Sequence, residues 1–231
     1  MNNILILGSK PPGKIPKISA ECIFSSNGSA ELAKIYIDRF KKTKHVCIIG
    51  AKSFSKLDDI KKRVVNSLPD EIIIRDYNKI YSYFHTLFEK DVIFKKFTKK
   101  EQFLYQKFSF EGGLLDLYFA EFNYEKNFMG KLKHIYNCLV YEGFMGVSSG
   151  FFALLYAAQK YPNSNLILSG IGFEGGDHYY KTGEMTMKRG FVDNFLFSKL
   201  KKKIKKRIAV LDAETSNKFN IKKIEAEHIE V

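Results

Sequence analysis

Two serines and a glycine, Ser148, Ser149 and Gly150, form the part of the chain best suited to hold an anion. Apolar residues at helical spacing follow them, which predicts a helix over residues 151–160 with the serines at its start. Serine hydroxyls, backbone amides and the positive end of the helix dipole would then meet at one point, an arrangement that suits a phosphate or a carboxylate. Capping of the helix without any ligand would use the same residues, so both interpretations stay open here.

A glycine-rich loop after the next apolar run carries side chains that could bind or transfer a proton. The run covers residues 166–168 and continues through Ser169 and Gly170 into a loop that ends in His178, Tyr179 and Tyr180. Because such loops lie on the surface, we expect the histidine and the tyrosines to lie outside the core. The ordinary pKa of histidine, about 6.5, suits the removal of a proton from a hydroxyl near neutral pH.

Small polar residues also follow the first two apolar runs of the chain. Gly8 and Ser9 come directly after residues 4–7, and a glycine there lets the backbone approach a ligand closely. Asn27, after residues 22–24, offers a donor and an acceptor that suit a ribose or the edge of a pyrimidine. Open parallel sheets bind ligands at the carboxyl ends of their strands, where these residues would lie. A ligand-free turn and a helix cap are the alternative interpretations.

The elements that must position these residues follow from an alternation of short apolar runs with segments of helical length. This alternation predicts a single α/β domain over residues 1–231, with a Rossmann-like, mostly parallel sheet flanked by helices. The expected strands are residues 4–7, 22–24, 45–50, 72–74, 166–170 and 208–211. The expected helices are residues 31–41, 55–68, 151–160 and 193–206.

Residues 77–142 break this rhythm, because Phe and Tyr recur at helical intervals among lysines and no clear strand is evident. We predict that they form a helical insertion or lid within the domain. Their aromatic side chains could stack on nucleobases, but the strand motif of RNA-binding modules is missing and aromatics at this spacing more often fill a core. We therefore expect these aromatic residues to be packing residues: Tyr81, Phe84, Phe88, Phe103, Phe108 and Phe110.

Composition excludes several broad classes of protein. With 231 residues, of which 45% are hydrophobic and 15% aromatic, the chain can bury a full core and is not disordered. Its apolar runs are far shorter than the ~20 residues of a transmembrane helix, and its start lacks the features of a secretion signal. The three cysteines, Cys22, Cys47 and Cys138, show no metal-ligand spacing, so we expect buried thiols in a reducing cytoplasm.

The formal net charge of +13, from 38 Lys and Arg against 25 Asp and Glu, points to a polyanionic partner. Nucleic acid, anionic lipid and a phosphorylated small molecule all fit, and a composition biased towards lysine would show the same excess. The strongest basic run, residues 199–207, falls largely within a predicted helix, where a solvated helix face is one interpretation. Contact with the anionic inner face of a membrane is the other, and it would suit an enzyme whose acceptor is lipid-linked.

Together these motifs resemble those of the bacterial sialyltransferases and of the wider sialyltransferase-like group, which includes transferases of related 2-keto sugar acids. The family's first loop, Gly-Asn-Gly-Pro-Ser or similar, resembles Gly8, Ser9 and Pro11, and its Phe-Arg-Cys-Asn strand end resembles residues 24–27. Its central motif, a Thr-Ser-Gly helix start followed by a Leu-Ser-Gly-Ile-Asp strand, resembles residues 148–150 and 168–172. Animal members also carry a His-Tyr-Tyr motif, to which residues 178–180 are similar. The resemblance covers residues 1–50 and 146–215, and the central motif is its specific part.

The resemblance implies a glycosyltransferase that moves a 2-keto sugar acid from a donor activated by cytidine monophosphate (CMP) to a surface glycan, as in lipopolysaccharide or capsule synthesis. It implies neither a metal nor a cofactor, and the sequence lacks an Asp-x-Asp metal motif. The partners would be the CMP-sugar and a glycan acceptor rather than nucleic acid, in the cytoplasm or at the inner face of the membrane. The implied donor-binding residues are Gly8, Ser9, Asn27, Ser148, Ser149, Gly150, Gly170, Tyr179 and Tyr180.

Two departures from the family leave the catalytic residues open. Family members carry a general-base histidine shortly after the tyrosine loop, whereas residues 188–193 contain none. His178 or Asp193 would then accept the proton of the acceptor hydroxyl, and Arg189 would neutralise phosphate or carboxylate. Asp193 could also act covalently or simply cap a helix. The family's arginine before the Ser-Gly motif is replaced by Gly146. The missing base leaves a catalytically silent homologue as one alternative function, and the positive net charge leaves a basic nucleic-acid-binding α/β protein as the other.

Overall fold

An eight-stranded parallel sheet forms the centre of the protein, in the order β11-β10-β7-β1-β3-β4-β5-β6. The computed structural model describes residues 2–10, 15–88, 91–140, 146–173, 176–178, 181–185 and 187–229. The strands of this sheet are β1 (Asn3–Leu7), β3 (Cys22–Ser26), β4 (Lys44–Gly50), β5 (Glu71–Arg75), β6 (Ile93–Phe97), β7 (Asn165–Ser169), β10 (Ile208–Val210) and β11 (Lys222–Lys223). The predicted Rossmann-like α/β fold with a mostly parallel sheet is confirmed.

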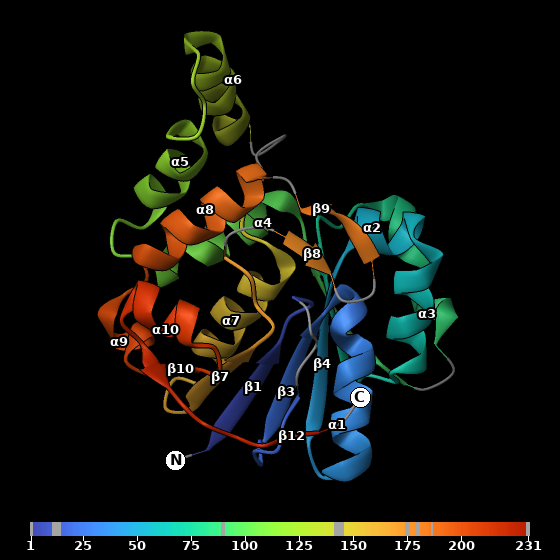
Figure 1. Ribbon diagram of the computed structural model, residues 1–231. Helices are drawn as coiled ribbons and strands as arrows, with labels where there is room; N and C mark the ends of the chain where they lie inside the picture. Colours follow the sequence, from blue (N-terminus) through green and yellow to red (C-terminus); the bar gives the residue numbers. More distant parts are fainter. Residues whose placement is uncertain are drawn as a thin grey trace.

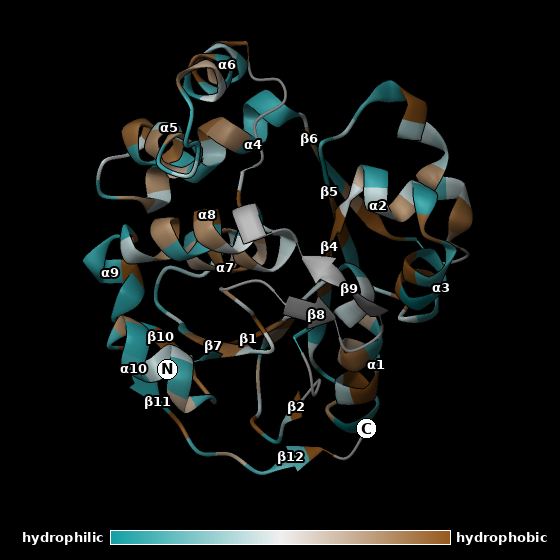
Figure 2. Cartoon of the chain, turned by 45° about the horizontal axis from the view of Figure 1, so that its top comes forward, coloured by the Kyte–Doolittle hydropathy of each residue, from teal (hydrophilic) through white to brown (hydrophobic). Residues whose placement is uncertain are grey.

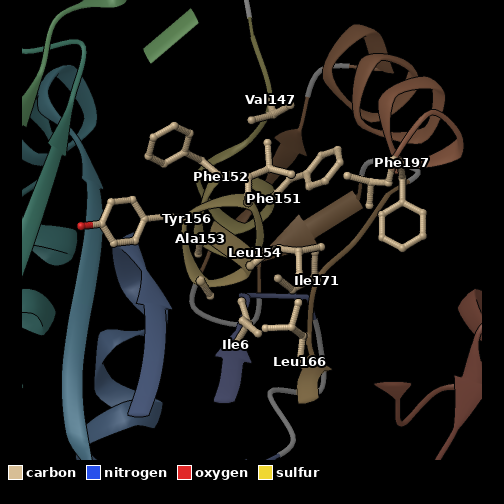
Figure 3. Packing of buried hydrophobic residues seen from close by; sticks show 14 of the residues in the cluster. Ile6, Val147, Phe151, Phe152, Ala153, Leu154, Tyr156, Leu166, Ile171 and Phe197 are labelled. Carbon is tan, nitrogen blue, oxygen red and sulfur yellow. The ribbon is translucent and has the colours of Figure 1, made fainter. Parts of the chain in front are cut away.

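Helices cover both faces of the sheet (Figure 1). One face carries α1 (Ala30–Arg39), α2 (Ala51–Lys56) and α3 (Asp58–Asn66). The other face carries α4 (Lys99–Gln106), α7 (Ser149–Lys160) and α8 (Met187–Ser198). Successive strand residues point to opposite faces, so Ile6 packs toward α7 whereas Leu5 packs toward α1. Figure 3 shows Ile6 and Leu166 of the sheet next to Leu154 of α7, with Phe151 of the same helix farther from the strands. Strands buried on both faces are apolar along their length, which is why apolar runs identified them.

The strand order reverses between β1 and β7. From β1 the chain adds β3, β4, β5 and β6 on one side, and it then places β7 on the other side of β1. The helix α7 makes this crossing and contacts β1, β3, β4 and β7. The loops after β1 and β7 therefore belong to opposite halves of the sheet, which is the position where open α/β sheets bind ligands.

The two ends of β5 hold the two ends of α7. Glu71, the first residue of β5, is buried. Its carboxylate forms ion pairs with three lysines: Lys160 of α7 at 2.9 Å, Lys95 at 3.0 Å and Lys44 at 3.2 Å. Burial alone would raise the pKa of Glu71, but the three lysines lower it to about 2. Arg75, the last residue of β5, contacts the first turn of α7. The helix is therefore fixed along its length over the sheet.

Shorter elements complete the fold. β2 (Ile15–Pro16) pairs antiparallel with β12 (His228–Ile229), and β8 (Gly176–His178) pairs antiparallel with β9 (Lys181–Met185). The other elements are η1 (Asn27–Ser29), η2 (Lys79–Leu87), η3 (Lys107–Ser109), α5 (Leu114–Phe122), α6 (Phe128–Leu139), α9 (Lys202–Lys205) and α10 (Ala213–Phe219).

All three cysteines are buried and free, as predicted. In the described part of the chain, no helix has the length and apolar character that a bilayer crossing requires.

The segment 77–142 is largely helical, as predicted, but it contains a strand that the sequence analysis missed. β6 pairs parallel with β5 and forms one edge of the sheet. Lysines interrupt its apolar residues, as is common where an edge strand faces solvent, so no continuous apolar run marked it. The expectation that the aromatic residues pack inside holds for Phe84, Phe103 and Phe110, which are buried, but it is wrong for the exposed Phe108.

Two predicted helices are each divided in the structure. Residues 55–68 fall in α2 and α3, which meet at the extended residue Leu57. Residues 193–206 fall in α8 and α9, because the backbone between them pairs with another segment: Lys201 N–H donates to the Ser109 carbonyl, and Glu111 N–H donates to the Lys199 carbonyl. The basic run is therefore helical only over four residues. Its last member, Arg207, donates to the backbone carbonyl of Ala158 in the last turn of α7 and to those of Tyr161 and Ser164 just after it, and so has a structural role.

Candidate functional site

The loops after β1 and β7 are joined backbone to backbone where the strand order reverses. Gly8 N–H donates to the Ser169 carbonyl at 2.8 Å, and Lys10 N–H donates to the Gly170 carbonyl at 2.8 Å. A Cβ added at Gly8 would lie 2.1 Å from the Gly170 carbonyl oxygen, and Gly170 itself has a φ of +66°. Both glycines therefore lie at the expected edge of the sheet. This close approach requires glycine at both positions, whether or not a ligand binds there.

We expect Gly8→Ala to lower the free energy of unfolding by about 1–3 kcal/mol, because the added methyl group overlaps a backbone carbonyl that cannot move aside cheaply. Gly50, at the end of β4, is the matched control. An added Cβ there would meet only Ser53 Oγ at 3.7 Å, and its φ of −82° suits any residue. Gly50 is the N-cap of α2, where alanine is less favourable than glycine, so Gly50→Ala should cost at most about 1 kcal/mol and less than Gly8→Ala. Urea unfolding followed by circular dichroism measures both, and equal costs would contradict the prediction.

The helix α7 begins at the same edge, as the serines predicted. Ser148 is its N-cap, and the Ser148 hydroxyl accepts the N–H of Phe151 at 3.2 Å. An added Cβ at Gly150 would lie 3.5 Å from Ser26 Oγ, so this helix start lies beside the end of β3. Residues 148–150 are all partly exposed. The capping interpretation is thus confirmed, and the binding of an anion at the same place stays a prediction.

Arg75 belongs to this site, and the sequence analysis missed it. The side chain is buried, and its Nη1 donates to Ser149 Oγ at 3.2 Å while Nη2 donates to the Val147 carbonyl at 2.6 Å. Its Nε donates to Gln102 of α4. Burial lowers the pKa of Arg75 to about 10, so the group stays charged at neutral pH. The available signal was an arginine directly after an unbroken Ile-Ile-Ile run, where a buried strand has no place for a charge without partners.

Asp193 and Arg189 of α8 face the same helix start. Asp193 is fully buried, and its Oδ1 accepts the backbone N–H of Ser148 at 2.9 Å. Arg189 lies four residues earlier and thus on the same side of α8. Among the described residues, Asp193 Oδ2 and Arg189 Nε are buried without a hydrogen-bond partner. The alternative that Asp193 caps a helix is wrong, because it lies in the interior of α8.

The electrostatics of Asp193 follow from its burial. Burial raises the pKa of this carboxyl to about 6, although the Ser148 hydrogen bonds and the positive charges of Arg189 and Arg75 act in the opposite direction. A carboxylate with this pKa is ionised at neutral pH and is more basic than an ordinary aspartate. The site therefore combines two guanidinium groups, a helix N-terminus and a carboxylate able to accept a proton.

Asn27 and Ser9 lie at the expected edge of the sheet, but the hydrogen bond that the Asn27 side chain accepts is structural. Its backbone is left-handed, with a φ of +49°, and its Oδ1 accepts the N–H of Gly50 at 3.1 Å, which ties the end of β3 to the end of β4. The neighbouring Ser29 hydroxyl donates to the Leu7 carbonyl at 2.9 Å. Ser9 follows Gly8 and is partly exposed. A donor-binding role for Asn27 and Ser9 stays a prediction.

Part of the predicted site lies outside the described residues. Tyr179 and Tyr180 are not described. His178 ends β8, but its side chain is likewise outside the description. Their roles in binding or proton transfer stay predictions, and Asp193 is the candidate base whose surroundings are known.

Neither a metal cluster nor the surface depression described below involves the predicted site residues that the structure describes. Among the described residues, no group of three or more His, Cys, Asp or Glu side chains is placed to hold a metal ion. A surface depression of about 550 Å³ lies at the opposite, amino edge of the sheet, where Asn3, Glu21 and Thr43 line it. None of the predicted site residues lines this depression, and the polar groups described above gather at the other edge.

The fold and the site define a Rossmann-like α/β protein with a charged, partly buried cluster at its topological switch point. Comparison with protein-family models, with curated proteins and with solved structures finds no match to this chain. The resemblance to sialyltransferases accordingly rests on the sequence motifs alone.

Proposed function

We propose that this chain is a glycosyltransferase similar to the sialyltransferases, which transfers a 2-keto sugar acid from a CMP-activated donor to a hydroxyl of a glycan acceptor. The observation that carries the proposal is the buried Asp193 carboxylate, which lies against the start of α7 with one oxygen unpartnered among the described residues. A buried, unpaired carboxylate oxygen costs stability, and such costs are typical of functional sites.

Asp193 is assigned the role of general base. In the transfer, the acceptor oxygen forms a bond to the anomeric carbon, the bond from that carbon to the phosphate oxygen breaks, and CMP leaves with the electron pair. The proton of the acceptor hydroxyl passes to Asp193 Oδ2. A pKa of about 6 makes this oxygen ionised at neutral pH yet basic enough to take the proton as the bond forms.

The donor carries a phosphate and a carboxylate, and the positive groups of the site suit both. Arg189, whose Nε has no partner among the described residues, is assigned to one of these anions. The start of α7 offers its helix dipole to the other. Arg75 uses all three of its nitrogen atoms on protein groups, so it acts through its charge and by positioning residues 147–149. It brings a guanidinium to the helix start, where Gly146 replaces the arginine of the family.

Thermal unfolding with added nucleotides tests the donor class. We expect CMP to raise the Tm selectively, since a ligand at 100 times its Kd stabilises the folded state by about 2.7 kcal/mol. For a chain of this length that corresponds to roughly 5–10 °C. Cytidine diphosphate, purine nucleotides and a short RNA serve as comparisons. A response to RNA alone would favour the nucleic-acid-binding alternative, and no response to any nucleotide would contradict the proposal. CMP binding without transfer or donor hydrolysis would identify a silent homologue.

We expect Ser149→Ala to weaken CMP binding about tenfold, because it removes a hydroxyl from the helix start and releases its hydrogen bond from Arg75. Ser198→Ala, at the end of α8, is the matched control, since that exposed hydroxyl donates only to the Phe195 carbonyl. Isothermal titration calorimetry measures both affinities. Equal affinity in the two variants would show that the donor binds elsewhere.

A further inference from the structure

An apolar stripe runs along α6, at the end of the molecule farthest from the sheet (Figure 1). Its side chains are between 42 and 73% exposed, which is unusual for so many large apolar residues on one helix. Their spacing places them on one side of the helix. The stripe consists of Phe128, Met129, Leu132, Ile135, Tyr136 and Leu139.

The opposite side of α6 is already occupied by α5. His134 and Cys138 are buried there, and His134 Nε2 donates to the Tyr118 carbonyl of α5 at 2.7 Å. His134 Nδ1 lies 3.6 Å from Glu121 Oε2, also on α5. α5 in turn contacts α8, so the pair is attached to the body of the protein through α5. These contacts hold the apolar stripe of α6 outward, and Figure 2 shows hydrophobic segments on both α5 and α6.

Positive charge accompanies the stripe. Between residues 125 and 140 the chain carries Lys126, Lys131 and Lys133 against a single carboxylate, Glu125, which precedes α6 and lies beside Gly130 in its first turn. A helix with an apolar face and lysines beside it is suited to the interface of a membrane, where the apolar side chains enter the acyl boundary and the ammonium groups meet anionic headgroups. We propose that the apolar stripe of α6 binds the surface of an anionic lipid bilayer. The proposal does not depend on the assigned transferase activity.

A second copy of the chain fits the stripe less well. α6 is about 18 Å long, so the one side that it leaves outward is small beside the ~800 Å² per partner of a stable protein interface. A two-fold contact through the stripe would also bring two sets of lysines together with no carboxylate on the helix to pair them. An anionic bilayer offers an apolar layer much larger than the stripe, and its headgroups carry the negative charge that α6 itself does not provide for its lysines.

Vesicle co-sedimentation of the full chain tests the proposal, with vesicles of phosphatidylcholine alone and of phosphatidylcholine with one-third phosphatidylserine. We expect binding to the anionic vesicles and at least a tenfold loss of partitioning in the double variant Phe128→Gln/Leu139→Gln. The matched control is Leu68→Gln/Ile80→Gln, which removes two apolar side chains of similar exposure elsewhere on the surface. Both pairs are exposed, and circular dichroism checks that the variants fold.

Two more variants separate the charged elements. Lys131→Glu/Lys133→Glu should abolish the preference for phosphatidylserine, whereas Lys202→Glu/Lys203→Glu, in α9, should retain it. Vesicle binding that is absent in the wild type, or unchanged in the α6 double variant, would overturn the proposal. A different pair of results would also overturn it: the wild type is a dimer in light scattering and does not bind vesicles, and the α6 double variant is a monomer. A second copy of the chain would then cover the stripe.

Discussion

Arg75→Ala should lower the free energy of unfolding by about 3–5 kcal/mol, one of the two largest effects that we expect from a single substitution. The substitution leaves Gln102 Oε1 and the Val147 carbonyl without their charged donor in a buried place, and it removes the guanidinium that lies 4.9 Å from the ring centre of Phe152. It also frees the first turn of α7 from the end of β5. Arg75→Lys should recover little of this loss, because one ammonium group cannot reproduce the planar fork of donors.

Arg63→Ala is the matched control for this effect. Arg63 forms ion pairs with Glu31 and Asp59 at the surface of α3, where screening by water limits the gain to about 1 kcal/mol or less. Urea unfolding curves of the two alanine variants measure the difference directly. A cost of less than 1 kcal/mol for Arg75→Ala would show that its buried hydrogen bonds do not hold the site together.

Asp193→Asn should reduce sugar transfer by at least 100-fold, because the variant lacks the proposed base. The same substitution should not destabilise the protein at neutral pH in the way that loss of Arg75 does. The amide can still accept the Ser148 N–H through its oxygen, and it removes a buried negative charge whose second oxygen is unpartnered among the described residues. Loss of activity without loss of stability is the behaviour expected of a residue retained for function.

The pH dependence of stability tests the environment of Asp193 independently of activity. Burial raises the pKa of this group from 3.8 to about 6, so between these values the folded state binds more protons than the unfolded state. The contribution of Asp193 to stability therefore falls as the pH rises from about 4 to about 6, by roughly 3 kcal/mol. The variant lacks this term and should gain that amount relative to the wild type between pH 4 and pH 7.

Glu71→Gln provides the opposite case for comparison. The three lysines lower the pKa of Glu71 to about 2 despite its burial, so this carboxylate stabilises the folded state above its unfolded pKa of 4.5 and loses that contribution as the pH falls toward 2. Glu71→Gln should therefore destabilise the protein at pH 7. If Asp193→Asn and Glu71→Gln showed the same sign at neutral pH, the account of Asp193 as a destabilising buried charge would be wrong.

Local patterns predicted the site only where one short segment forms it. The serine cap of α7, the glycines after β1 and β7, and their common edge of the sheet all follow from apolar runs and turn residues next to them. Arg75 and Asp193 show a different situation. Arg75 reaches Ser149 across 74 residues of sequence, and Asp193 reaches Ser148 across 45. No periodic pattern in the sequence indicates where these side chains lie. Arg75 was therefore missed, and the role of Asp193, as a catalytic residue or as a helix cap, stayed open.

Helix and strand limits failed where tertiary contacts compete with local preference. The predicted helix over residues 193–206 is divided because residues 199–201 pair with the backbone of residues 109–111. β6 is a strand because β5 offers an open parallel edge, although lysines interrupt its apolar residues. In both cases the hydrogen-bond partner is remote in sequence, and a local pattern contains no information about it.

The sequence by itself determined the α/β class, the main strands of the sheet and the edge at which the polar loops gather, because burial on both faces requires apolar runs and parallel strands align their carboxyl ends. Tertiary structure alone decided which charges meet at that edge, since desolvation and pairing depend on what packs around each group. Tertiary structure also decided that the apolar side of α6 faces outward. The spacing of the apolar residues shows that they share one side of the helix, but only the position of the neighbouring elements determines whether that side is covered.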